Sequence, residues 1–312
     1  MERRTFLIGS GALALSACSS AEPFDTGEVR AAFPPVGAFV EVEGLPVHYW
    51  ERGDGPPVVL VHGAAGNLRD WTFDVGPRLA EEFRVIAFDR PGFGYSGRPD
   101  LLGYDPRVQA RILRKASAKL GAKRPVVVGH SWGGALAMAW ATEAPESIAG
   151  AVPVSGVTIP YGGLVRVFYA IGLGEVATDL YSDYLLSSAR EGGGIERFLG
   201  RVFRPQSIPA GYLEHVGAPL ALRESTLRAN SEDLAHLNAA LIEMAPKYPG
   251  LRMPIEAVHG DADFIDWDDH ALPLVEQTPS ANLALLPGVG HMAHHAAPDE
   301  IGAAVDRVLT RA

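Results

Sequence analysis

The stretch from residue 126 to residue 137 constrains the fold of this chain more than any other. Three valines, typical of a buried strand, lead into a Gly-x-Ser-x-Gly turn centred on Ser131, and helix-forming Ala, Leu and Met follow. A serine at such a strand-to-helix corner is lifted out of the sheet, and the helix N-terminus places partial positive charge beside its oxygen. The alternative is a turn serine that hydrogen-bonds its own backbone. The strand before the turn and the helix after it favour a nucleophile at Ser131.

The rest of the chain alternates apolar, strand-like runs with helical patterns. Strands are predicted at residues 39–42, 46–50, 58–61, 84–88, 126–128, 148–154, 254–258 and 282–286. Helices are predicted at residues 72–82, 106–120, directly after Ser131, and at 298–309. Because strands that alternate with helices pair in parallel, we expect an α/β fold with a mostly parallel eight-stranded sheet and helices on both faces.

The alternation of strands and helices is interrupted between about Gly156 and Gly250, where helical patterns are punctuated by glycines and prolines. We therefore predict a sheet core formed by residues 35–155 and 251–312. A helical cap, residues 156–250, is predicted as an insertion after the sixth strand. The length of 312 residues suits one domain with such an insertion.

The composition excludes several kinds of partner. The formal net charge is −10 at pH 7, so charge does not draw the protein to nucleic acid or to anionic lipid. The single cysteine, Cys18, rules out an intramolecular disulfide. The sequence gives no indication of the oligomeric state.

The N-terminus has the features of an export signal. Arg3 and Arg4 precede an apolar run from Phe6 to Leu15, which is shorter than the about 20 residues that a transmembrane helix needs. The arginine pair resembles a twin-arginine signal, and Leu-Ser-Ala-Cys at residues 15–18 resembles a bacterial lipobox. We expect a signal peptide at 1–18, a lipid on Cys18, a tether at 19–34 and a place in the cell envelope, with membrane contact through the lipid only. The alternative is a disordered tail with a chance cysteine.

Polar residues follow five of the predicted strands. They are His62-Gly63-Ala64, Asp89-Arg90-Pro91-Gly92, Ser131, Asp261-Ala262-Asp263 and Gly290-His291. In open parallel sheets, ligands bind outside the carboxyl ends of the strands, so these side chains are expected at one edge. A serine nucleophile needs a base within hydrogen-bond reach and a carboxylate that orients the base. The chain order Ser131, Asp263, His291 is the one expected for this fold.

With these motifs the chain resembles the α/β-hydrolase family over about residues 36–309. The resemblance implies that Ser131 is the nucleophile, His291 the base and Asp263 the orienting acid. It also implies an oxyanion hole formed by the backbone N–H groups of Ala64 and Trp132, and no cofactor. Other carboxylates compete for the role of the acid: Asp261, Asp266, Asp268 and Asp269.

Several neighbours of these residues also receive predictions. The motifs place His62, Gly63, Phe93 and Trp132 around the substrate pocket, although His62 and His130 are expected mainly to buttress loops. Arg90 is expected to hold the turn at Asp89. Other aromatic residues are expected in core or cap packing: Trp71, Phe168, Tyr169, Tyr181, Tyr184 and Trp267.

His294 and His295 follow His291 at about one helical turn, which raises the possibility of a zinc site. Zinc needs further ligands at coordination distance, and the only cysteine is committed to the N-terminal motif. We therefore expect surface histidines here and no metal.

Serine at position 131 implies acyl transfer, because family members that act on epoxides or haloalkanes use aspartate at that position. We expect a carboxylic-ester hydrolase for small or medium acyl chains, with a small-molecule ester or ketone as its partner. The alternatives within enzymes are a carbon–carbon bond hydrolase of the vinylogous-ketone type, a cofactor-free perhydrolase and an aminopeptidase. From another class, the chain could be an inactive hydrolase fold used for binding.

Overall fold

The computed structural model describes residues 26–162 and 193–312. The predicted signal peptide with Cys18, and four cap aromatics, Phe168, Tyr169, Tyr181 and Tyr184, lie outside the described residues. Among the helices that are described, none combines the length and the apolar composition needed to cross a membrane.

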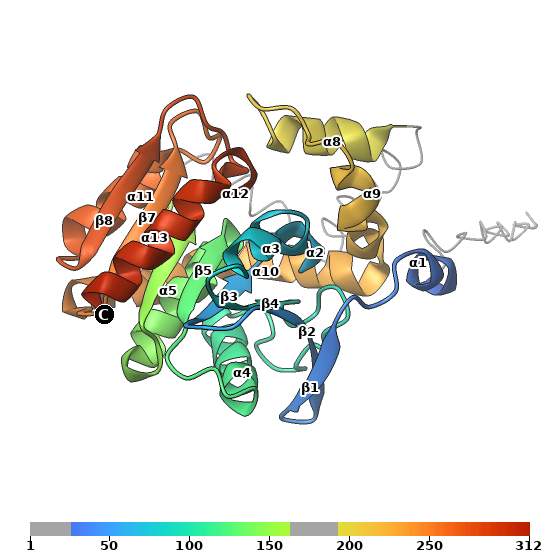
Figure 1. Ribbon diagram of the computed structural model, residues 1–312, viewed down its shortest axis with the longest axis horizontal. Coiled ribbons are helices and arrows are strands. Elements are labelled where there is room, and N and C mark those ends of the chain that lie inside the picture. The colour runs from blue at the N-terminus through green and yellow to red at the C-terminus, as the bar shows by residue number, and fades with distance from the viewer. Residues whose placement is uncertain (1–25, 163–192) are drawn as a thin grey trace, which may run out of the picture.

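One eight-stranded sheet runs through the molecule in the order β1-β2-β4-β3-β5-β6-β7-β8 (Figure 1). The strands are β1 (Ala38–Val42), β2 (Leu45–Arg52), β3 (Pro57–Val61), β4 (Arg84–Phe88), β5 (Val126–His130), β6 (Gly150–Val154), β7 (Ile255–Gly260) and β8 (Ala281–Leu286). β2 pairs antiparallel with both β1 and β4, and every other neighbouring pair is parallel. This confirms the predicted mostly parallel eight-stranded sheet of the α/β-hydrolase type.

Alternate residues of the central strands point into two different hydrophobic cores. In β3, Val59 and Val61 belong to one core, and Val58 and Leu60 belong to the other. Side chains alternate across a strand, so a strand that is apolar at every position must be covered on both faces.

Helices cover both faces of this sheet (Figure 1). The helices outside the predicted cap are α2 (Arg69–Thr72), α3 (Val75–Leu79), α4 (Pro106–Lys119), α5 (Trp132–Glu143), η1 (Pro145–Ser147), α11 (Trp267–Gln277), α12 (Ala293–Ala296) and α13 (Pro298–Arg311). The single helix predicted at residues 72–82 is instead two short ones, α2 and α3. The side chain of Asp105 caps α4 by accepting a hydrogen bond from the Arg107 amide, and Pro106 occupies the first turn.

The described part of the predicted cap is helical. It contains α8 (Gly194–Val202), α9 (Tyr212–Val216), η2 (Ala218–Leu222), α10 (Glu224–Met244) and η3 (Ala245–Gly250). α8 and α9 lie at the same side of the molecule as α12, the upper side in Figure 1. Buried α10 residues such as Leu237, Leu241 and Met244 belong to the same hydrophobic core as α4 and α5. α10 is therefore part of the body of the protein as well as of the insertion.

Part of the predicted tether is folded. Residues Thr26–Ala32 form helix α1, and the segment after it is attached to the body. The Tyr95 hydroxyl donates to the Phe33 carbonyl, and Arg69 Nη2 donates to the Pro34 carbonyl at 2.6 Å. Arg69 lies 35 positions after Pro34, and Tyr95 lies 62 positions after Phe33. Because these partners are distant in the sequence, the composition of the segment does not predict the contacts.

Candidate active site

Ser131 lies at the corner between β5 and α5. Its φ of 54° and ψ of −117° are strongly disfavoured for a residue with a side chain. Its amide donates to the Val154 carbonyl at 2.9 Å, and its carbonyl accepts from Gly134 and Val157. The neighbouring backbone thus holds Ser131 in this strained conformation, which is the geometry expected of a nucleophile elbow.

Two glycines allow the loop after β3 to approach this corner. A Cβ on Gly63 would lie 3.1 Å from the Cβ of Ser131, and a Cβ on Gly133 would lie 2.5 Å from the Val61 carbonyl oxygen. Only glycine tolerates the second approach without a backbone shift. The 62–66 loop therefore lies directly against Ser131.

Asp263 and His291 are brought together from the loops after β7 and β8. Both carboxylate oxygens of Asp263 lie 3.0 Å from His291 Nδ1. Oδ1 also accepts from the Ile265 amide at 2.9 Å, and His259 Nε2 lies 3.1 Å from Oδ2. Burial alone would raise the pKa of Asp263, but the hydrogen bonds from these imidazoles hold it below its ordinary value. An ionised Asp263 keeps the proton of His291 on Nδ1 and leaves Nε2 as the basic nitrogen.

The structure brings His291 to the elbow without joining it to Ser131. His130, which precedes Ser131, donates from Nε2 to the His291 carbonyl at 3.0 Å, and the two rings are 4.8 Å apart. Within the described chain, no hydrogen bond links the Ser131 hydroxyl to His291. Such a bond is often long without substrate and tightens in the complex.

The other candidate acids have different positions. Asp261 is exposed, and its Oδ1 accepts from the Gly288 amide at 2.6 Å. Asp266 precedes α11, and Asp268 and Asp269 lie in the first turn of that helix. Of these carboxylates, only Asp263 has a hydrogen bond to His291 in the part of the chain that the structure describes.

The Ala64 and Trp132 amides, which the resemblance predicts as oxyanion donors, lie on the two segments that meet at Gly63 and Gly133. Neither amide donates a hydrogen bond to any described residue. The next amide along the loop, that of Ala65, is occupied by Asn230 Oδ1 of α10 at 2.7 Å.

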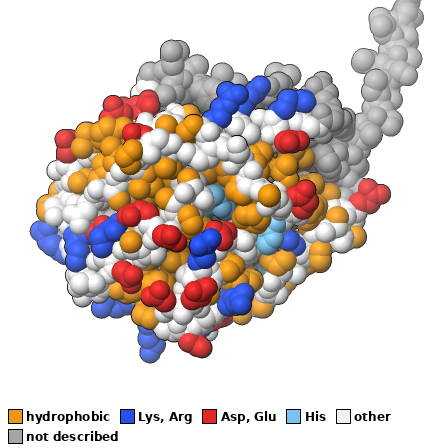
Figure 2. All heavy atoms as spheres, turned by 45° about the horizontal axis from the view of Figure 1, so that its top comes forward, with side chains coloured by type: hydrophobic (Ala, Val, Ile, Leu, Met, Phe, Trp, Pro, Cys, Tyr) orange, Lys and Arg blue, Asp and Glu red, His pale blue; other side chains and the backbone are white. Residues whose placement is uncertain are grey.

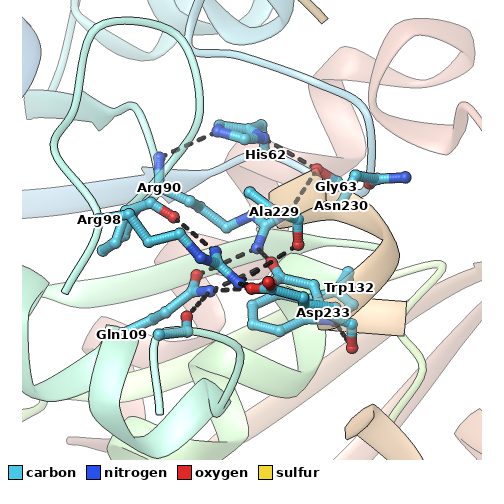
Figure 3. A network of polar contacts seen from close by, with 12 residues as sticks. His62, Gly63, Arg90, Arg98, Gln109, Trp132, Ala229, Asn230 and Asp233 are labelled. Carbon is cyan, nitrogen blue, oxygen red and sulfur yellow. Dashed lines mark hydrogen bonds and ion pairs between the residues drawn. The ribbon is translucent and has the colours of Figure 1, made fainter. Parts of the chain in front are cut away.

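A buried network connects the same loop to α10 (Figure 3). Arg90 is fully buried and pairs through Nη1 with Asp233 Oδ2 at 2.6 Å, while its Nη2 donates to the Gly63 carbonyl at 3.1 Å. Gln109 and Arg98 also donate to Asp233. Burial lowers the pKa of Arg90 to about 10, which leaves it charged at neutral pH. Arg90 thus holds the 62–66 loop to α10 through Asp233, and it also contacts the turn after Asp89, where its carbonyl accepts from the Phe93 amide at 2.9 Å.

The rings of Phe93 and Trp132 enclose the guanidinium of Arg90. Each ring centroid lies 4.0 Å from the guanidinium carbon, and the two residues are 0% and 1% exposed. Trp132 Nε1 also donates to the Asp233 carbonyl at 3.3 Å. Cation–π packing therefore fixes both rings against Arg90, and their place in a substrate pocket stays a prediction.

His62 has a fixed, neutral ring. Its Nδ1 donates to the Gly63 carbonyl at 2.9 Å, and its Nε2 accepts from the Arg90 amide at 3.0 Å. Burial and the charge of Arg90 lower the pKa of His62 to about 4. The ring is fully buried and supports the loop, and its place beside a substrate pocket stays a prediction.

The side chains of His294 and His295 are 0% and 2% exposed, which corrects the expectation of surface histidines. His294 Nε2 donates to Asp70 Oδ2 at 3.0 Å, and His295 Nε2 donates to Asp70 Oδ1 at 2.8 Å. The Tyr212 hydroxyl of α9 donates to the same carboxylate at 2.7 Å. Burial alone would raise the pKa of Asp70, but these imidazoles hold it well below its ordinary value. Asp70 of α2 is therefore hydrogen-bonded both to the cap helix α9 and to α12, the helix that follows His291.

One ring nitrogen from each histidine and an oxygen of Asp70 lie within 4.8 Å of one another, a spacing that metal ligands could have. A zinc-bound histidine usually donates its second ring N–H to a carbonyl or carboxylate. The Nδ1 atoms of His294 and His295 have no hydrogen-bond partner among the described residues. The cluster fits a hydrogen-bonded carboxylate better than a zinc site.

The surface on this side of the molecule is mixed in character. Figure 2 shows histidine side chains among predominantly hydrophobic ones, with acidic and basic side chains interspersed around them. Phe264, directly after Asp263, is 61% exposed, and its ring centroid lies 4.5 Å from that of His291. An exposed aromatic ring beside the His291 imidazole provides an apolar contact for a ligand.

The fold and the site define a class of protein: a mostly parallel α/β sheet with a strained serine elbow and a histidine–aspartate pair at the strand ends. A family model described as "alpha/beta hydrolase fold" matches residues 56–177. The chain has the α/β-hydrolase fold.

Proteins similar to this chain carry names that describe different activities. Haloalkane dehalogenase 2 of Mycobacterium tuberculosis is 29% identical over 267 residues, covering 83% of this chain and 90% of the relative. The structure of wild-type Cfl2 from Burkholderia cenocepacia has a TM-score of 0.74 at 26% identity, covering 86% of this chain and 94% of that one. A meta-cleavage product hydrolase from Pseudomonas fluorescens, CumD, has a TM-score of 0.70 at 19% identity, covering 88% and 97%, and shows the shared fold alone.

Proposed function

We propose that the protein is a serine hydrolase that cleaves carboxylic esters of small or medium acyl chains. The observation that carries this proposal is the strained serine at the elbow, next to the loop that bears His291 hydrogen-bonded to Asp263. A serine supports an acyl-enzyme, whereas the family members that act on haloalkanes or epoxides use aspartate at this position. The name of the dehalogenase relative therefore does not transfer to this chain.

In the proposed mechanism, His291 Nε2 removes the proton from the Ser131 hydroxyl as Oγ bonds to the ester carbonyl carbon. The N–H groups of Ala64 and Trp132 hold the resulting oxyanion. The C–O bond to the leaving group then breaks, and His291 gives its proton to the departing alcohol. In the second half, His291 removes a proton from water as the water oxygen bonds to the acyl carbon. The bond to Ser131 Oγ then breaks, Ser131 takes the proton back from His291, and the carboxylic acid is released. Asp263 stabilises the imidazolium in both halves.

Labelling with a fluorophosphonate probe tests the nucleophile. We expect an adduct on Ser131 in the folded protein and none in Ser131→Ala. The rate of p-nitrophenyl butyrate hydrolysis in that variant should fall to the residual level left by binding and the oxyanion hole, a loss of about 10⁴-fold or more. Folded wild-type protein that is neither labelled nor active would favour the alternative of an inactive binding protein.

A substrate panel tests the finer proposal. We expect p-nitrophenyl esters of two to eight carbons to be hydrolysed faster than a vinylogous dienone substrate. The reverse order would favour a carbon–carbon bond hydrolase, and peracid formation from hydrogen peroxide would favour a perhydrolase. Neither chemistry requires a different fold.

We also propose that the chain is exported and lipid-anchored through Cys18. The support is the sequence pattern at residues 3–18. Cys18→Ser should move the protein from the membrane fraction to the soluble fraction of fractionated cells, with Ser19→Ala as a control that stays in the membrane fraction. An unchanged distribution would refute the anchor and leave the proposed reaction intact.

A further inference from the structure

We propose that the oxyanion hole of this protein is positioned by the insertion helix α10, through Asp233 acting on Arg90 and through Asn230. The inference rests on the proposed function and deepens it. It assigns Arg90, Asn230 and Asp233 as positioning residues that act on the backbone of the 62–66 loop.

The first step concerns the peptide unit that contains the Ala64 N–H. In a planar trans peptide, the carbonyl of one residue and the N–H of the next point in opposite directions. The Gly63 carbonyl accepts from Arg90 Nη2 at 3.1 Å and from His62 Nδ1 at 2.9 Å. Fixing that carbonyl also fixes the direction of the Ala64 N–H. A charged donor on the carbonyl also polarises the peptide, which strengthens its N–H as a donor.

The second step concerns the groups that hold the guanidinium of Arg90 in place. Its guanidinium pairs with Asp233 of α10 at 2.6 Å and lies between the rings of Phe93 and Trp132, each 4.0 Å away. Figure 3 shows Arg90, Trp132 and Asp233 lying next to one another. Trp132 carries the other proposed oxyanion N–H, and its ring donates to the Asp233 carbonyl at 3.3 Å. One turn of α10 therefore contacts both segments that supply oxyanion donors.

The third step concerns the following peptide unit. The Ala65 amide donates to Asn230 Oδ1 at 2.7 Å, and Ala65 has a φ of 52°, a left-handed conformation that favours glycine. Asn230 is buried and lies one turn before Asp233 on α10. The side chain of Asn230 stabilises this conformation and fixes the peptide unit on the far side of Ala64. The two units that flank Ala64 are thus held from the same helix.

The experiment compares Asn230→Leu with Asn238→Leu. Asn238 lies two turns further along α10 and makes two hydrogen bonds of 2.9 Å to the backbone of Tyr161, so its replacement removes side-chain-to-backbone hydrogen bonds of the same kind without touching the 62–66 loop. Loss of a whole oxyanion donor reduces rates by about 10²–10³-fold, so a displaced donor in Asn230→Leu should lower kcat by about 10–100-fold. KM should change by less than about threefold, and Asn238→Leu should keep kcat within about twofold of wild type.

A trifluoromethyl ketone, which forms a tetrahedral adduct with serine, provides a second readout. Its affinity should fall in Asn230→Leu in parallel with kcat/KM, because both depend on the oxyanion donors. Amide exchange of the peptide covering residues 62–68 should accelerate in Asn230→Leu and not in Asn238→Leu. A variant with unchanged kcat and ketone affinity, or with losses equal to those of Asn238→Leu, would overturn the inference while wild-type activity upholds the proposed function.

A second variant tests the Arg90 step if Asn230→Leu does not fold. Arg90→Met combined with Asp233→Leu replaces the buried ion pair by apolar side chains, which proteins often tolerate. We expect this folded double variant to be labelled at Ser131 by the fluorophosphonate and to show the same fall in kcat and ketone affinity. Wild-type kinetics in the double variant would also overturn the inference.

Discussion

Ser131, the proposed nucleophile, has a strained backbone conformation. Its φ of 54° with ψ of −117° is a conformation that glycine adopts readily and that other residues adopt at a cost of about 1–3 kcal/mol. The surrounding hydrogen bonds from Ser131 to Val154 and from Gly134 and Val157 to Ser131 maintain it. A strained residue of this kind at the end of a strand is expected where function and not stability determines the conformation.

This strain gives a prediction about stability. Ser131→Gly should be about 1 kcal/mol more stable to urea unfolding than Ser131→Ala, because both lack the hydroxyl and only glycine relieves the positive φ. Neither variant should hydrolyse esters. If glycine is no more stable than alanine at this position, the elbow is not strained in solution.

The sequence indicated Ser131, Asp263 and His291 because each lies in a short motif directly after an apolar strand. The structure joins Asp263 to His291 and places His291 beside the elbow. Asn230, Asp233 and Asp70 could not be predicted in the same way. Asn230 contacts Ala65 across 165 positions, and Asp70 contacts His295 across 225 positions. A single polar residue on a helix has no local pattern that identifies so distant a partner.

At the scale of elements, the strands were predictable because each is an apolar run with polar or glycine-containing ends. The helix predicted at 106–120 is observed as α4, and that at 298–309 as α13. The prediction of one helix at 72–82 was wrong, because residues 73 and 74 separate α2 from α3. Helix α1 packs on the body through the buried Val29 and through Arg30, whose guanidinium carbon lies 5.7 Å from the Tyr95 ring centroid, and the composition of the segment does not encode these contacts.

The role of α10 also depends on tertiary contacts. The sequence predicted a helical cap over this region, but not that buried polar side chains of α10 would hold the 62–66 loop. Asp233 is fully buried, and burial raises its pKa while Arg90 and Arg98 lower it. The polar side chains of Asn230 and Asp233 on this helix therefore point into the protein, whereas polar residues of an amphipathic helix usually face solvent.

At the scale of the whole molecule, several imidazoles are buried in neutral form. Burial is the main cause that lowers the pKa of His62, His270 and His294 to about 4 each, from an ordinary value of 6.5. Between these values the unfolded chain holds a proton on each imidazole that the folded chain lacks. The stability contributed by the neutral rings is complete above about pH 6.5 and is lost as the pH falls toward 4.

We therefore expect the free energy of unfolding to fall steeply between pH 6.5 and pH 4.5, with uptake of at least three protons on unfolding near pH 5, since burial also holds the pKa of His130 well below its ordinary value. Urea titrations at half-unit pH intervals would measure this slope. His236→Gln serves as a control, since that half-buried ring stacks on Tyr104 at 3.9 Å outside these clusters. A flat profile over this range would contradict the neutral burial of the three rings.

The glycines at the elbow have a consequence for how this protein can evolve. A side chain on Gly133 would meet the Val61 carbonyl at 2.5 Å, and one on Gly129 would meet the Gly133 carbonyl even more closely, whereas Gly162, Gly200 and Gly250 have open space around them. Substitutions at Gly162, Gly200 and Gly250 therefore meet no steric obstacle, whereas substitutions at Gly129 and Gly133 require a shift of the backbone. New specificities in descendants of this chain would arise through the surrounding loops and the insertion, while the turn itself stays invariant.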